Sequence, residues 1–111
     1  MAIFSTHLLN SIDGTHASEV EIVIYKVNNN NKVVFLEDKT DSSGRMLKEF
    51  ELTKEDCESD YEMIINSGKY FRNTSEIINS ISVKFKMKDP LKKYHIPLIV
   101  SPNGYSIWWS K

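Results

Sequence analysis

Two histidines, one arginine and a pair of tryptophans are the side chains of this sequence best suited to chemistry on a small molecule: His7, His95, Arg45, Trp108 and Trp109. An imidazole with an ordinary pKa of ~6.5 can accept or release a proton near neutral pH. A guanidinium stays charged and offers paired hydrogen-bond donors. Each of these residues taken alone also fits a structural role, because sheet histidines are often hydrogen-bonded in place and turn arginines are often solvated.

Other reactive groups in the sequence give no comparable pattern. His16 follows Asp13-Gly14-Thr15 in a predicted loop and receives no role, and Cys57 fits an unreactive thiol in a loop. The HEXXH, CXXC, P-loop and GXSXG patterns do not occur, so zinc proteolysis, thiol redox chemistry, nucleotide hydrolysis and serine hydrolysis lose their usual sequence support.

The candidate residues lie on segments that alternate between apolar and polar side chains, which is the pattern of half-buried β-strands. His7 shares one side of its segment with Ser5 and Leu9, and His95 shares a side with Pro97 and Ile99. Further strand-like segments are EVEIVIYKV, KVVFLED, RMLKEFEL, DYEMIIN and ISVKFKM. Seven or eight strands at this spacing predict an all-β fold, a two-sheet antiparallel β-sandwich.

Turn-forming residues separate these segments. The four asparagines from Asn28 to Asn31 predict a hairpin tip, and Asp41-Ser42-Ser43-Gly44 predicts a hairpin loop in which Gly44 takes positive φ. Pro97 removes a ladder donor and therefore predicts an edge strand or an irregular pairing. The segment Lys69–Ser80 drops the alternation and predicts one short helix packed against the sheet.

Length and composition are those of one globular domain covering residues 1–111, with 41% hydrophobic and 26% charged residues. The net charge of −1 gives no field that would attract nucleic acid or an anionic membrane. No apolar run approaches the ~20 residues needed to span a bilayer. The start of the sequence has no basic region followed by an apolar segment and cleavage site, so we expect a cytoplasmic protein.

Four segments, in order, resemble the 5-hydroxyisourate hydrolase branch of the transthyretin-like proteins. They are Phe4–Asn10 (FSTHLLN), Thr40–Arg45 (TDSSGR), Gly68–Phe71 (GKYF), and YHIPL followed by SPNGYS between Tyr94 and Ser106. The last block is the most specific. The resemblance runs from about Ile3 to Ser106, nearly the whole chain.

This resemblance implies a transthyretin-like sandwich of eight strands with a short helix, assembled as a homotetramer (a dimer of dimers) with active sites in a channel between dimers. It implies hydrolysis of 5-hydroxyisourate in urate degradation, with His7, Arg45 and His95 as catalytic and substrate-binding residues and with Ser106 and Trp108 as further substrate contacts. It implies no metal and no other cofactor, and it leaves open which histidine is the base. Transthyretin, the hormone-carrier branch, lacks the two histidines and the arginine.

The C-terminal residues differ from the tyrosine-arginine-glycine-serine tail that the resemblance implies, because Trp108, Trp109, Ser110 and Lys111 stand there. Three interpretations of the tryptophans remain open: packing at an interface, a remodelled wall of the substrate site, or a site that binds an aromatic ligand without turnover. The alternative function is therefore a non-catalytic transthyretin-like protein that binds an aromatic small molecule in the channel between dimers.

Overall fold

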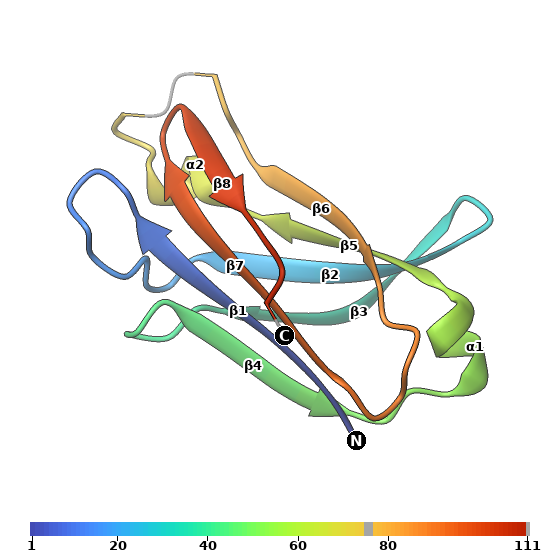
Figure 1. Cartoon of the computed structure of the whole chain (residues 1–111). Coiled ribbons are helices and arrows are strands. Elements are labelled where there is room, and N and C mark those ends of the chain that lie inside the picture. Colours follow the sequence, from blue (N-terminus) through green and yellow to red (C-terminus); the bar gives the residue numbers. More distant parts are fainter. Residues whose placement is uncertain (75–76, 111) are drawn as a thin grey trace.

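Two four-stranded sheets face each other across one apolar core in the computed structural model, which describes residues 1–74 and 77–110 (Figure 1). One sheet has the order β4-β1-β7-β8 and the other the order β3-β2-β5-β6. The strands are β1 (Ala2–Asn10), β2 (Glu21–Asn28), β3 (Asn31–Lys39), β4 (Arg45–Phe50), β5 (Asp60–Ile65), β6 (Ile81–Lys86), β7 (Lys93–Ser101) and β8 (Gly104–Ile107). The predicted β-sandwich is confirmed, although β1 and β7 run parallel.

The alternation of β1 explains which side of its sheet is wet. Phe4, Thr6 and Leu8 are fully buried in the core, whereas the intervening positions point away from it. The buried hydroxyl of Thr6 has a hydrogen-bond partner, because it donates to the Ile96 carbonyl at 2.6 Å. The side chains between Phe4, Thr6 and Leu8 therefore form the outer face on which a site can be built.

The asparagine run forms the predicted hairpin tip between β2 and β3. Asn28 pairs with Asn31, and the two residues between them have φ values of 47° and 73°. Asparagine tolerates this left-handed backbone better than most residues, and two such positions make the turn that suits the twist of a hairpin.

The turn from Asp41 to Gly44 is present, but the prediction that it joins two paired strands is wrong. The Asp41 N–H donates to the Arg45 carbonyl at 2.8 Å, and beyond this turn β3 and β4 enter different sheets. The buried residue Thr40 marks the separation, because it exchanges backbone hydrogen bonds with Val20 and Glu19 rather than continuing toward β4.

Pro97 lies in an interior strand, so of the two predicted alternatives, an edge strand or an irregular pairing, the edge strand is wrong. β7 pairs with β1 on one side and with β8 on the other. The Pro97 carbonyl accepts from the Trp108 N–H at 3.4 Å. The nitrogen and carbonyl of one strand residue face the same neighbour, so the Pro97 nitrogen, which has no hydrogen to donate, also faces the tail beyond the last residue of β8. The proline is tolerated because no ladder bond of β8 is lost there.

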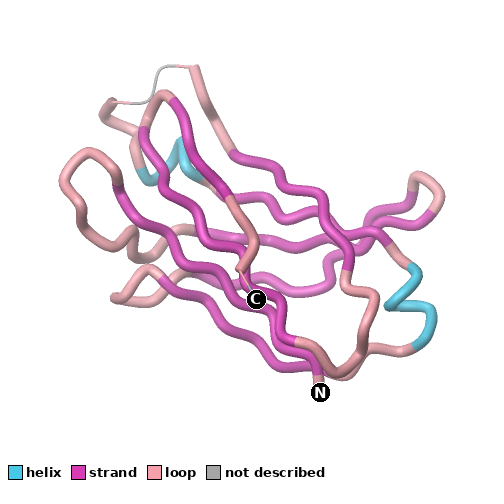
Figure 2. Tube along the Cα trace, in the orientation of Figure 1, coloured by secondary structure: helices cyan, strands magenta, loops and turns pink. Residues whose placement is uncertain are grey.

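The predicted helix over Lys69–Ser80 is shorter and earlier than expected. Helix α2 spans Ser67–Tyr70 and is capped by the Asn66 side chain, which accepts from the Lys69 N–H at 3.3 Å. Ile77 is 91% exposed and does not pack on the sheet, and residues 75–76 lie outside the described part of the chain. The two helices lie at opposite ends of the sandwich (Figure 2).

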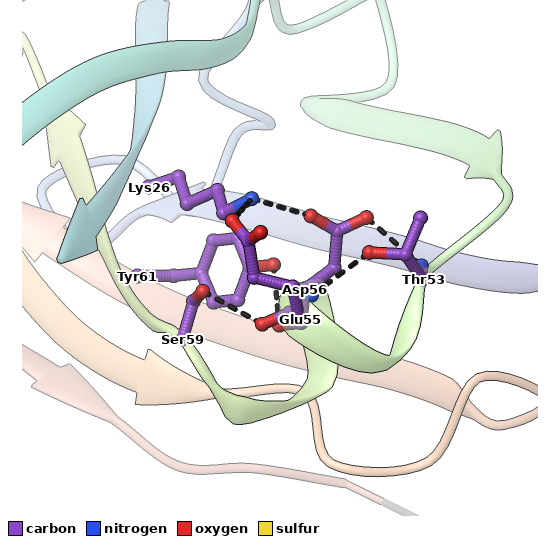
Figure 3. Close-up of polar contacts among 6 residues, drawn as sticks. All are labelled: Lys26, Thr53, Glu55, Asp56, Ser59 and Tyr61. Atoms are coloured by element: carbon purple, nitrogen blue, oxygen red, sulfur yellow. Dashed lines mark hydrogen bonds and ion pairs between the residues drawn. The ribbon is translucent and has the colours of Figure 1, made fainter.

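The other helix, α1 (Lys54–Glu58), was not predicted, and it places Cys57 in a helix rather than a loop. Its start is a capping box, in which Thr53 Oγ1 accepts from the Asp56 N–H and the Asp56 carboxylate accepts from the Thr53 N–H. Lys26 donates to Asp56 at 2.6 Å and ties the helix to β2, and the Tyr61 hydroxyl donates to the Asp56 carbonyl (Figure 3). These contacts brace the end of the sandwich far from the loop after β1 (Figure 1).

Within the two described ranges, no helix is long and apolar enough to cross a membrane.

Candidate functional site

His7, Arg45 and His95 come from three adjacent strands of one sheet. His7 in β1 is the register partner of Arg45 in β4. On the other side of β1, Ser5 is the partner of His95 and His7 is the partner of Pro97 in β7. Because neighbouring strands lie roughly 5 Å apart, the structure brings the three predicted residues into one small area of the sheet.

The three side chains also share a side of that sheet. Phe4 and Thr6 on β1, Met46 on β4 and Ile96 on β7 are buried in the core, so the alternate positions point outward. His7 and His95 are half-buried and Arg45 is exposed. A small molecule can therefore reach all three groups from outside the sandwich.

His95 is held by a serine that the sequence analysis did not select as a site residue. The Ser5 hydroxyl lies 2.7 Å from His95 Nδ1, and Ser5 is itself 6% exposed. Burial lowers the pKa of His95 below its ordinary value of 6.5; a hydrogen bond with the Ser5 backbone opposes this shift, and the nearby charges of Arg45 and Lys93 add to it. His95 is therefore neutral at pH 7, with Nδ1 oriented by Ser5.

His7 is held by His16, to which the sequence analysis gave no role. Its Nε2 lies 3.0 Å from His16 Nδ1, and the two rings stack with centroids 5.1 Å apart. Burial and the charge of Arg45 lower the pKa of His7, with smaller contributions in the same direction from His16 and His95, while a hydrogen bond with the Ser43 backbone opposes the shift. His7 is likewise neutral at pH 7.

The turn before β4 fixes the backbone from which Arg45 projects. The Asp41 carboxylate accepts from the N–H groups of Ser43 at 2.9 Å and of Arg45 at 3.0 Å. These two bonds hold the pKa of Asp41 below its ordinary value. The charged carboxylate thus sets where the guanidinium enters the site.

A cavity of about 190 Å³ opens between β4 and the start of β7. Its lining includes Ser5, Arg45, Leu47, Lys93 and His95. The cavity combines a guanidinium, an ammonium and one imidazole with an apolar wall, which suits a planar polar ring of modest size.

The structure separates the two other predicted contact residues. Ser106 is exposed on β8 opposite Ile99, four residues past His95, or roughly 13 Å along the strand. Trp108 is 47% exposed and lines, together with His95 and Trp109, a larger cavity of about 840 Å³ beside β6 and β8. Trp108 thus lies beside the histidine, whereas Ser106 lies away from it.

The tail is attached along β7. The Ser110 N–H donates to the His95 carbonyl at 2.9 Å, so the chain after β8 runs along β7 (Figure 1). Lys111 lies outside the described residues. Among residues 1–74 and 77–110, no group of three His, Cys, Asp or Glu side chains is arranged to hold a metal ion.

Ser5 and His16 are the functional candidates that sequence reasoning missed. Alternation placed Ser5 on the same side as His7, but the pairing of Ser5 with His95 depends on the parallel register of β1 and β7. Nothing in the sequence shows that the loop carrying His16 turns back on β1.

A model of the HIUase/Transthyretin family matches residues 4–109. The 5-hydroxyisourate hydrolase of Salmonella dublin is 31% identical over 108 residues, which cover 96% of this chain and 79% of that protein. The structure of Klebsiella pneumoniae 5-hydroxyisourate hydrolase is 19% identical; the match covers both chains completely, with a TM-score of 0.82. An (S)-allantoin synthase structure is 22% identical with a TM-score of 0.81; the match covers 99% of this chain and 44% of that one.

Proposed function

Since the chain belongs to the HIUase/Transthyretin family, we propose that it is an enzyme, a 5-hydroxyisourate hydrolase that opens a cyclic amide in urate degradation. Relatives with this activity in their names match nearly the full chain. The observation that carries the assignment is the convergence of His7, Arg45 and His95 on one outer face.

The reaction needs a base for water, a positive group for the carbonyl oxygen and a proton for the leaving nitrogen. His95 is the better placed base: when its Nδ1–H donates to the Ser5 hydroxyl, the lone pair on Nε2 can accept a proton from water. The new bond joins the water oxygen to the ring carbonyl carbon as negative charge moves to the carbonyl oxygen.

Arg45 stabilises that oxyanion through its paired N–H donors and holds the ring in place. As the C–N bond breaks, the electron pair of the broken bond stays on the ring nitrogen, which takes the proton that His95 accepted from water. Neutral His7, across the strand pair from Arg45, helps to hold the ring. His95 therefore gains one proton from water and gives one to the leaving nitrogen, so it is neutral again at the end of the cycle. This cycle uses side chains alone.

The assembly we propose is a homotetramer built as a dimer of dimers. Its support is the family resemblance together with apolar side chains on the same outer face, since Leu47 is 54% and Ile99 is 36% exposed. Burying such residues against a second dimer would leave the half-buried histidines beside a channel. The half-buried lone thiol of Cys57 fits a reducing compartment, and we place the protein in the cytoplasm.

The test generates 5-hydroxyisourate from urate and follows its ultraviolet decay with and without protein. We expect clear acceleration at micromolar protein and a loss of at least roughly 100-fold in kcat/KM for His95→Asn, as is usual for removal of a general base. An unchanged decay rate in the presence of wild-type protein would reject the enzyme assignment.

The alternative, a carrier of an aromatic ligand, is favoured by one observation: Trp108 and Trp109 are 47% and 71% exposed beside the large cavity. Quenching of tryptophan fluorescence by aromatic ligands, with no acceleration of 5-hydroxyisourate decay, would support that alternative instead.

A further inference from the structure

The imidazole of His16 is a polar contact of the site that the proposed reaction does not yet use. It belongs to the loop between β1 and β2, is exposed to solvent, and meets His7 through a 3.0 Å contact between nitrogens and a stack with 25° between ring planes. A pair of nitrogens at this distance shares one proton, so one ring donates and the other accepts.

The loop that carries His16 is fixed to the sheet on both sides of the residue. The Asn10 N–H donates to the Thr15 carbonyl at 2.8 Å, and the Ala17 N–H donates to the Leu8 carbonyl at 2.9 Å. Ala17 is fully buried. The backbone on both sides of His16 therefore follows β1, which explains how an exposed loop residue keeps a defined position over His7.

A second turn locks the same loop from the opposite side. Thr40, which is 2% exposed, donates its hydroxyl to the Ala17 carbonyl at 2.7 Å. Gly44 has φ +72°, and a Cβ there would lie 2.5 Å from the Leu8 carbonyl oxygen and 3.2 Å from the Cβ of His16. The chain thus packs His16 tightly against the turn that carries Arg45.

The direction of the shared proton follows from the other bond of His7. A hydrogen bond with the Ser43 backbone favours the protonated ring, so an N–H of His7 donates there. Because Nε2 faces His16, the donor to Ser43 is Nδ1. In neutral His7 the lone pair on Nε2 then accepts from His16 Nδ1–H.

We propose that His16 is a positioning residue of the hydrolytic site: it orients the ring of His7 and, by donating Nδ1–H to Nε2, fixes the proton of neutral His7 on Nδ1. This inference rests on the proposed function and deepens it, because it separates the two imidazoles. The Nε2 lone pair of His7 is occupied by His16, which leaves His95 as the base that takes the proton from water and returns it to the leaving nitrogen.

Several charged or titratable groups face His7 and must be considered with His16. Arg45 lies across the strand pair, His95 lies on β7, and Asp41 lies in the turn before β4. Arg45, His16 and His95 each disfavour a positive charge on the ring of His7, and Asp41 favours it. Variants of His16 therefore have to be compared with Arg45, His95 and Asp41 left unchanged.

The direct test is ¹⁵N NMR of the imidazole rings in wild-type protein and in three variants. His16→Phe keeps a ring that can stack but cannot donate, and His16→Asn places an amide N–H where Nδ1–H was. Ser11→Ala, in an exposed position of the same loop, is the matched control. At pH 7.5 we expect His7 to carry its proton on Nδ1 in wild type, His16→Asn and Ser11→Ala.

His16→Phe is expected to lose this preference and to raise the midpoint of His7 titration, because both the donated bond and the charge of the neighbouring imidazole are gone. In the substrate-decay assay it should lower kcat about fivefold to tenfold with little change in KM, the size expected for one neutral hydrogen bond. His16→Asn should recover most of that loss. The limb of the pH profile that reports His7 should move with its NMR midpoint.

An unchanged tautomer and midpoint of His7 in His16→Phe would overturn the inference, and so would equal kcat in wild type and His16→Phe. Failure of the proposed function gives a different result. If wild-type protein does not accelerate substrate decay, the hydrolase assignment is rejected, while the NMR comparison still reports whether His16 controls the proton of His7.

Discussion

His95 and His7 differ in what holds each ring, and this difference sets their chemistry. A serine hydroxyl engages Nδ1 of His95, whereas a second imidazole engages Nε2 of His7. A hydroxyl can accept a hydrogen bond from Nδ1–H and leave the far nitrogen basic, but an imidazole that donates occupies the lone pair that a base needs. Two residues of one type therefore serve two functions because of their neighbours.

The pH dependence follows from the lowered pKa values of both rings, which lie below 6.5. Each ring is neutral in the folded enzyme at pH 7, so the acid limb of kcat/KM is expected to have its midpoint below 6.5. The measurement is a pH profile of substrate decay in buffers of constant ionic strength. A midpoint above 6.5 would contradict the assignment of a buried, neutral base.

The same shifts have a consequence for stability. A histidine whose pKa is lower in the folded than in the unfolded state contributes its stability fully above the unfolded value of 6.5, because the unfolded chain binds more protons below it. Stability is therefore expected to fall as the pH decreases from 6.5, and His95→Asn is expected to reduce this dependence. Denaturant unfolding between pH 5 and 8 measures it.

At the scale of elements, the turn before β4 positions both Arg45 and His16. Gly44 combines positive φ with a site that leaves no room for Cβ against the Leu8 carbonyl. Gly44→Ala is expected to lower the free energy of unfolding by about 1–3 kcal/mol and to lower kcat/KM. Gly104→Ala, where nothing lies within 4 Å of the added Cβ, is the matched control.

Denaturant unfolding of both glycine variants decides this point. Equal stability of Gly44→Ala and Gly104→Ala would mean that the turn adapts at no cost, and the packing between the two loops would not be what holds His16.

The alternation of single segments was enough to predict most strands, and the reason is local. The segment ISVKFKM supplies β6, because its side chains alternate between the core and the solvent along the strand. The errors concern pairing instead. Whether β3 pairs with β4, and whether Pro97 lies at an edge, depends on which sheet each strand joins, and that choice is made by contacts distant in sequence.

For the site, too, residue types could be predicted from the sequence, whereas contacts between distant segments could not. His7, Arg45 and His95 could be selected by residue type and resemblance, and the register places them together. The contact between His16 and His7 depends on a loop folding back through the bonds of Ala17 and Thr40. Thr53 and Asp56 have the three-residue spacing of a capping box. The short helix α1 that follows was not predicted, because its mostly charged residues show no apolar periodicity.

At the scale of the whole molecule, the outer face of the β4-β1-β7-β8 sheet combines polar site residues with exposed Leu47 and Ile99. We expect the protein to sediment as a tetramer at micromolar concentration. Leu47→Glu is expected to shift it toward dimers and to lower activity, because the charge would be buried between dimers. Val33→Glu, at an exposed apolar position of β3 in the opposite sheet, introduces the same charge and serves as the control.

Analytical ultracentrifugation with parallel activity measurements tests this assembly. A fully active monomer at the assay concentration would show that the site needs no second copy and would reject the proposed channel.

The central claim is that His95 and Arg45 act on one substrate molecule within a single site. A double-mutant cycle of kcat/KM for 5-hydroxyisourate, with His95→Asn, Arg45→Ala and the double variant, tests it most directly; Arg72→Ala, in an exposed turn, serves as the arginine control. Residues that act as a unit lose activity non-additively, so the double variant is expected to be scarcely slower than the worse single variant. Losses that multiply independently, or an Arg45→Ala variant as active as Arg72→Ala, would contradict the claim.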